Sequence, residues 1–147
     1  MIRMDSTSQM LKEFTEAITA LRRLRRERKL DEVQYRINET ALSLLGMQYS
    51  TLTMADAAST AKLLGQPQRV VVLARLVAEE AELLEQKAEP ARASARWVLA
   101  LELSLEARAL GAKLREEDAQ AFSELQLKVE PTLLSGRHQE LLAKLET

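Results

Sequence analysis

Apolar residues recur at spacings of three and four along most of the chain, and few residues interrupt that pattern. The first stripe contains Met10, Phe14, Ala17, Leu21 and Leu24. Such spacing places side chains on one face of an α-helix. Four glycines and three prolines in 147 residues leave long segments between turns. Aromatic residues make up only 3% of the chain, which disfavours a sheet. These features predict an all-α fold.

The glycines and prolines divide the chain into six to seven expected helices. The first helix opens at Asp5 or Ser6, the second runs from Asp31 to Gly46, and the third lies between Thr53 and Gly65. Pro67 opens the fourth helix, and Pro90 opens the fifth, which Gly111 stops. The sixth helix covers about Arg115–Lys128, and a short last helix follows Gly136. The fourth is apolar on most sides and is expected to be central. No flexible linker interrupts the chain, so residues 1–147 are expected to form a single domain.

The compartment is inferred from what the sequence lacks. There is no cysteine, which excludes disulfides and thiolate metal sites. Residues 1–5 carry no apolar leader core. The longest apolar run, Val70–Ala74, is far shorter than the roughly 18 residues that a membrane span needs. The expectation is a cytoplasmic protein without a membrane partner.

No catalytic signature is recognisable in the sequence. His138 is the only histidine, lacks the spacing of a metal site, and is expected to pack in a stripe with Leu134, Leu141 and Leu145. Neighbouring carboxylates at 116–118 diverge by about 100° on a helix and suit its first turn. The isolated glycines form no phosphate-binding loop. We therefore expect no enzyme, no cofactor and no metal.

One local feature of charge stands out in a chain of net charge −1. The cations of this basic segment are Arg22, Arg23, Arg25, Arg26, Arg28 and Lys29. They form either a contact for nucleic acid, phosphate or an acidic partner, or a solvated helix end stabilised by the helix dipole and nearby carboxylates. The second interpretation is favoured, because no aromatic residues are interleaved for base stacking. A third is self-association with the Glu79–Glu85 face of another copy, which is expected to be exposed.

Residues 77–103 resemble a tetratricopeptide-type helical hairpin. The positions that match the family pattern are Ala81 and Leu84 on one helix and Ala93, Trp97 and Ala100 on the next. Small residues let two helices cross closely while a large ring fills the groove beside them. Ala88 stands where the family usually has a turn glycine. Trp97 is expected in the core rather than as an exposed anchor for a partner.

The resemblance extends weakly to the first part of the chain. Val33, Ile37 and Thr40 occupy the same relative places as the three matching residues of the second helix. The resemblance implies tetratricopeptide-like hairpins at about 6–46 and 68–110, stacked in a right-handed arrangement.

The whole layout also resembles a group of short bacterial proteins of unknown function. Its marks are the opening Met1–Asp5, the basic segment before Asp31 and the leucine-rich end at Gly46. Membership implies the same fold and says nothing about chemistry. The sequence thus favours a non-enzymatic interaction or scaffold protein, whose partner is another protein or a second copy in a homodimer. The alternative is a binder of nucleic acid or phosphate ligands through the basic segment, although a nucleic-acid partner is not favoured.

Overall fold

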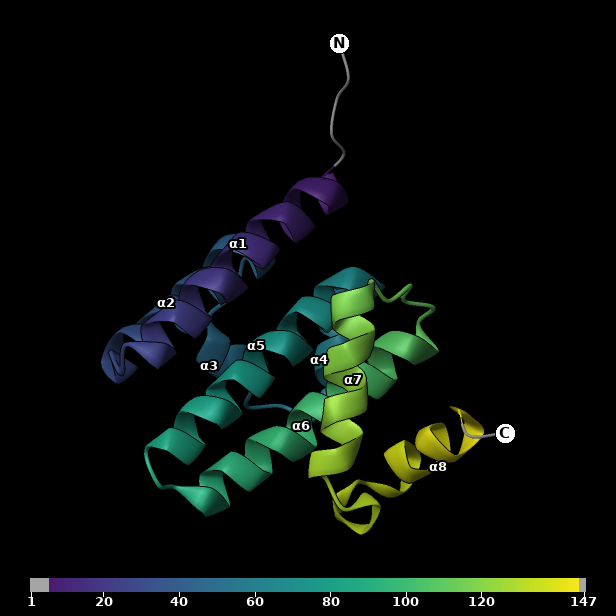
Figure 1. The fold of residues 1–147 in the computed structure, drawn as a ribbon. Helices are drawn as coiled ribbons and strands as arrows, with labels where there is room; N and C mark the ends of the chain where they lie inside the picture. The colour runs from purple at the N-terminus through teal and green to yellow at the C-terminus, as the bar shows by residue number, and fades with distance from the viewer. Residues whose placement is uncertain (1–5, 146–147) are drawn as a thin grey trace. The chain divides into compact units, whose positions relative to one another are not determined.

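The computed structural model describes residues 6–145. In that range it contains eight α-helices, one short 3₁₀-helix and no strand, so the all-α prediction is confirmed (Figure 1). The elements are α1 (Ser6–Arg26), α2 (Leu30–Leu45), α3 (Tyr49–Leu52), α4 (Ala57–Leu64), α5 (Pro67–Gln86), α6 (Pro90–Ala109), α7 (Glu116–Lys128), the 3₁₀-helix η1 (Pro131–Leu133) and α8 (Gly136–Leu145). The opening Met1–Asp5 lies outside the described residues.

The chain divides into two compact units, Met1–Met54 and Ala55–Thr147. In the first, α1 and α2 form an antiparallel hairpin and the short α3 contacts α2 (Figure 1). The buried apolar residues of this unit are Phe14, Ala17, Ile18, Leu21, Val33, Ile37, Ala41, Leu45, Tyr49 and Leu52. They follow the three- and four-residue spacing of the sequence, so each helix buries the face that the pattern predicts.

In the second unit, α5 and α6 form a longer antiparallel hairpin. Helices α4 and α7 each contact both members, and α8 contacts α6. Thirteen of the 20 residues of α5 are buried. The prediction that this helix is central is confirmed, because α4, α6 and α7 all pack on it.

Most helix ends lie where glycine and proline predict them, but the start of α4 does not. Pro67 and Pro90 open α5 and α6, and Gly46 closes α2 with a left-handed φ of 73°. The helix expected to start after Thr53 starts later: Asp56 caps α4 by accepting the amide of Ser59 at 2.7 Å. Thr53 instead ends the unpredicted α3. The aspartate takes the cap because it lies directly before the first helical residue.

The two hairpins turn in the same way. Arg28 and Ala88, sixty residues apart, have left-handed φ values of 59° and 57°. In both turns this residue donates its amide to the carbonyl three positions back, and the next residue donates to the carbonyl five positions back, at 2.9–3.1 Å. This is the Schellman motif, which usually places glycine at the left-handed position. Ala88 therefore occupies a left-handed turn position at which glycine is usual.

Candidate functional site

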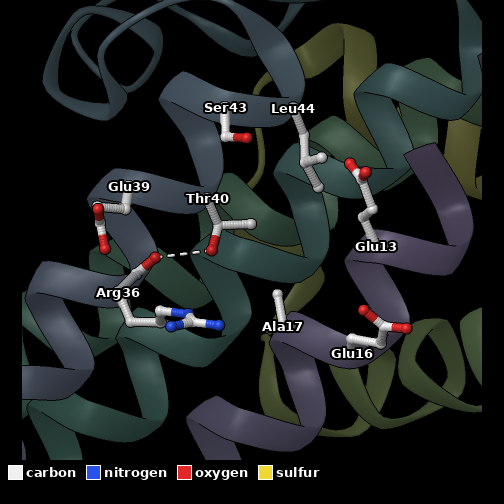
Figure 2. Close-up of a pocket in the computed structure, with 8 residues that line it drawn as sticks. All are labelled: Glu13, Glu16, Ala17, Arg36, Glu39, Thr40, Ser43 and Leu44. Atoms are coloured by element: carbon white, nitrogen blue, oxygen red, sulfur yellow. Dashed lines mark hydrogen bonds between the residues drawn. The ribbon is translucent and has the colours of Figure 1, made fainter. Parts of the chain in front are cut away.

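An open groove of about 330 Å³ lies between α1 and α2 in the first unit (Figure 2). Residues from both helices line it: Glu13, Glu16, Ala17, Arg36, Glu39, Thr40, Ser43 and Leu44. The hairpin brings these residues together because they lie at matching heights on two antiparallel helices. No sequence motif marks this site, because its two walls come from segments that are about twenty residues apart in the chain.

The groove is negatively charged, with three carboxylates against one guanidinium. Figure 2 shows Glu13 and Glu16 on the wall formed by α1, and Glu39 and Arg36 on the opposite wall. All four side chains belong to exposed residues. Among the described residues, these groups form no ion pair with one another, so their charges face solvent.

Glu39, which lines the groove, shares one face of α2 with two exposed apolar residues. Tyr35 is 64% exposed and Leu42 is 53% exposed. With Glu39 between them, they follow a spacing of four and three, which places them on one face of the helix. Large exposed apolar side chains beside a polar hollow are typical of contact surfaces.

The basic segment surrounds the tip of the α1–α2 hairpin. We call its six cations, at positions 22, 23, 25, 26, 28 and 29, the basic tip. Five belong to exposed residues, and Arg25 is half-buried. Lys29 pairs with Glu27 at 3.4 Å. The structure thus places all six candidate residues at one end of one hairpin.

The Glu79–Glu85 face of α5 differs from its prediction. It was expected to be exposed, but Glu79 and Glu80 are buried at 5% exposure. Glu80 forms an ion pair with Arg96 at 2.5 Å, across the hairpin. Glu82 and Glu85 lie near the ammonium of Lys128 at 3.9 and 3.8 Å. The expected exposure of this face is therefore wrong for Glu79 and Glu80, whereas Glu82 and Glu85 remain partly exposed.

Two of the acidic residues that open α7 lie in its first turn, as predicted, and the third also joins α7 to another helix. Glu116 and Glu117 are exposed in the first turn, where the helix dipole favours them. Asp118 is buried and accepts from Arg75 at 2.5 Å and from Arg115 at 3.0 Å. The carboxylate thus joins α7 to α5, which local sequence does not reveal because Arg75 is 43 positions away.

Residues of the proposed hairpin signature are all buried. Exposure is at most 2% for Ala81, Leu84, Ala93 and Ala100, and it is 7% for Trp97. The indole N–H of Trp97 donates to a carboxylate oxygen of Glu85 at 2.9 Å, and the ammonium of Lys128 lies 4.7 Å from the ring centroid. The large ring therefore packs in the hairpin and ties α6 to α5.

His138 lies in a hydrogen-bonded cluster between α8 and α6. Its Nε2 is 2.7 Å from an oxygen of Glu106, and its Nδ1 is 2.5 Å from the Ser135 hydroxyl and 3.3 Å from Glu102. Arg137 donates two hydrogen bonds to Glu106 at 2.7 and 2.9 Å. These bonds outweigh the effect of burial and lower the pKa of Glu106 below its ordinary value; the same pairing raises the pKa of Arg137. The cluster fastens α8 to α6.

The expected stripe around His138 is partly wrong. Leu134 and His138 are buried, but Leu145 is 41% exposed and Leu142 is buried instead. The inward face of α8 is displaced because the helix begins only at Gly136, so Leu134 precedes it. His138 is buried as expected, but among polar partners rather than apolar ones.

The order serine, histidine and glutamate in this cluster resembles a catalytic hydrogen-bond chain. One observation favours a structural role. The Ser135 hydroxyl accepts the backbone amide of His138 at 3.2 Å, as a helix cap does. The serine oxygen is therefore used at the start of α8.

Residues 6–145 contain no group of three or more His, Asp or Glu side chains arranged to hold a metal ion. Within the same range, no helix is both long and apolar enough to cross a membrane. Comparison with known proteins brings no match: no protein-family model, curated protein or solved structure is significantly similar to this chain.

Proposed function

We propose that this protein is a non-enzymatic interaction or scaffold module whose α1–α2 groove receives a positively charged segment of a partner protein. The groove is the observation that carries the proposal. It is open, has a volume of about 330 Å³, and is lined by residues of α1 and α2. Its excess of carboxylates favours lysine or arginine side chains of a partner, which such groups attract and hydrogen-bond.

Exposed apolar side chains beside the groove support a protein partner rather than a small cation. Tyr35 and Leu42 lie on the same face of α2 as Glu39 and are more than half exposed. Interfaces combine apolar or aromatic anchors with a polar rim, and tyrosine is frequent among residues that dominate binding energy. A partner helix with basic residues and one apolar face would contact both features.

A structural role for the charged clusters of the second unit supports the non-enzymatic part. Asp118, Glu80 and Glu106 each bond a cation from another helix. Strongly paired groups of this kind hold helices together, and their charges are already compensated. They are poor candidates for acid–base or nucleophilic catalysis.

We also propose that the two hairpins are degenerate copies of one tetratricopeptide-like unit. The shared turn sixty residues apart supports this relationship. Equivalent positions are also buried in both: Val33 with Ala93, and Ile37 with Trp97. Repeats of this type serve as binding surfaces in many proteins, which is an argument from fold alone.

Capture from the native cell with three baits tests the proposal. The baits are the wild type, the groove variant E16K/E39K, and the matched control E124K/E140K, which reverses two exposed glutamates of α7 and α8. We expect a protein that binds the wild type and the control but not the groove variant. The captured protein is then purified and titrated calorimetrically against the same three proteins.

The titration gives the decisive result. Affinity should fall at least tenfold for E16K/E39K and stay within about twofold for the control, since changes at charged interface groups of this kind typically exceed 1.4 kcal/mol. A partner that binds all three proteins equally would overturn the groove as the site. A groove variant with a lower unfolding midpoint than the control would be replaced by E16Q/E39Q in the same titration.

A further inference from the structure

We propose that the basic tip binds the phosphate backbone of double-stranded nucleic acid without sequence preference. The argument begins with the two hairpin turns. The α5–α6 turn makes the same backbone hydrogen bonds as the α1–α2 turn. Its equivalent segment, residues 82–89, carries three glutamates and one lysine, whereas residues 22–29 carry six cations and one glutamate. The turn therefore does not need cations, so its geometry does not explain the basic tip.

The cations of the basic tip also repel one another. Within α1, Arg22 and Arg26 are four positions apart, and Arg23 and Arg26 are three apart. Like charges at these spacings are neighbours on a helix surface and destabilise it. A costly charge cluster that the fold does not require is typical of a functional surface.

Carboxylates of the same unit leave much of this charge uncompensated. Glu27 pairs with Lys29 at 3.4 Å in a solvent-exposed contact. Arg23, Arg26 and Arg28 are exposed, and within residues 6–145 their guanidinium groups make no ion pair or hydrogen bond. Three guanidinium groups are thus available to an anion from outside the chain.

The chemistry of the tip selects phosphate over other anionic partners. Five of its six cations are arginines, whose planar guanidinium groups bind phosphate oxygens in pairs. The leucines at the tip, Leu24 and Leu30, are half-buried, so no large apolar side chain stands out to enter a membrane or anchor a protein interface. Phosphate-backbone binding is mainly electrostatic and needs no such anchor.

A duplex suits the tip better than a single strand. Proteins that bind single strands stack bases on aromatic side chains. No aromatic residue occurs between Phe14 and Tyr35. Contacts restricted to backbone phosphates position a protein on a duplex without reading its sequence. This site is separate from the groove, so either proposal can fail while the other stands.

Fluorescence anisotropy with labelled 20-base-pair duplexes of two unrelated sequences tests the proposal on the full chain. With four to five phosphates contacted, the plot of log affinity against log salt should have a slope of about −4. The test variant is R23Q/R26Q/R28Q. The matched control is K87Q/R92Q/K113Q, which removes the same charge from exposed positions of the second unit.

The proposal expects at least tenfold weaker binding by the tip variant, a slope reduced by about 3, and less than twofold change in the control. Both sequences should bind equally. The tip variant should unfold at a denaturant midpoint equal to or above that of the wild type, because repulsion is relieved. The proposal is overturned by no binding at 50 mM salt, by equal loss in the control, or by tighter binding to polyglutamate or to phosphatidylserine vesicles than to the duplex.

Discussion

The α1–α2 and α5–α6 hairpins share a turn and a pattern of buried positions, but they use their charged residues differently. The buried polar residues of the second unit are Thr60, Arg75, Glu79, Glu80, Glu106, Asp118 and His138, and several of them join helices. Within residues 6–54 of the first unit, the buried polar residue is Thr40. The first hairpin keeps its charges on the surface.

The two hairpins differ in whether their charges are paired within the protein. In the second unit, α4, α7 and α8 pack on the hairpin, and paired charges fix two of these helices in place. Around the α1–α2 groove, corresponding charges remain exposed. Paired and buried charges stabilise contacts within the protein, whereas exposed charges remain available to a partner.

The largest expected effect compares equivalent core positions. Trp97→Ala should destabilise the protein by about 4 kcal/mol and Ile37→Ala by about 3 kcal/mol, because each leaves a cavity in a packed hairpin. Denaturant unfolding followed by circular dichroism measures both. If the two units unfold in separate transitions, each variant should shift its own transition. A loss below about 1 kcal/mol at Ile37 would break the equivalence of the two positions.

The second prediction concerns the buried pair between α5 and α7. Asp118→Ala should cost about 3 kcal/mol of unfolding free energy, because it leaves the guanidinium of Arg75 buried without this carboxylate. The control is Arg92→Ala, which removes an exposed ion pair with Glu89 and should leave stability nearly unchanged. Equal effects in the two variants would show that the second hairpin does not depend on its buried charge.

The third prediction uses pH to test the attachment of α8. Glu106→Gln should lower the unfolding free energy at pH 7 by about 2 kcal/mol, since hydrogen bonds to a charged group are lost. The pKa of Glu106 is lowered in the folded state, so its contribution is fully present above the ordinary glutamate value of about 4.3. It disappears as pH falls through the lower folded value.

Urea unfolding of the wild type and E106Q from pH 7 to pH 3 measures this dependence. The difference between the two proteins should shrink as the pH falls below about 4. A difference that grows toward low pH would contradict the assigned sign. The comparable first-unit variant, Glu39→Gln, removes an exposed carboxylate and should show little difference at any pH.

The smallest expected effect tests the shared turn. Arg28→Gly and Ala88→Gly should each stabilise the protein by about 1 kcal/mol, because glycine adopts the left-handed conformation without steric strain. Gly111 ends α6 with the same hydrogen-bond pattern, so Gly111→Ala should destabilise by a similar amount. Thermal unfolding of the three variants measures the effect. A gain in thermal stability at only one of the two hairpins would show that their turns differ in backbone strain.

Sequence patterns predicted the fold class and many helix boundaries of this protein. Apolar spacing identified the buried faces of α1 and α2, and glycine and proline marked the ends of α2, α5 and α6. The short α3 was missed because four residues carry too little periodicity, and Thr53, which follows α3, was taken as the start of the next helix. These signals are reliable where they depend on neighbouring residues.

The two candidate sites also differ in whether neighbouring residues of the sequence reveal them. The basic tip is a contiguous segment, so its six cations were found from the sequence. The groove was not, because Glu16 and Glu39 come to line one groove only after the hairpin has folded. Glu79 and Glu80 were expected at the surface, since their charge gave no sign of the partners that enclose them.

By itself, the sequence determined the helices, their principal ends and the inward position of Trp97, because helix formation and capping depend on residues within about four positions of one another. Only the tertiary structure decided which charges are enclosed and which stay exposed. Arg75 meets Asp118 across 43 positions and His138 meets Glu106 across 32. A charge is buried stably only when a partner arrives from another helix, and that meeting depends on how the helices pack.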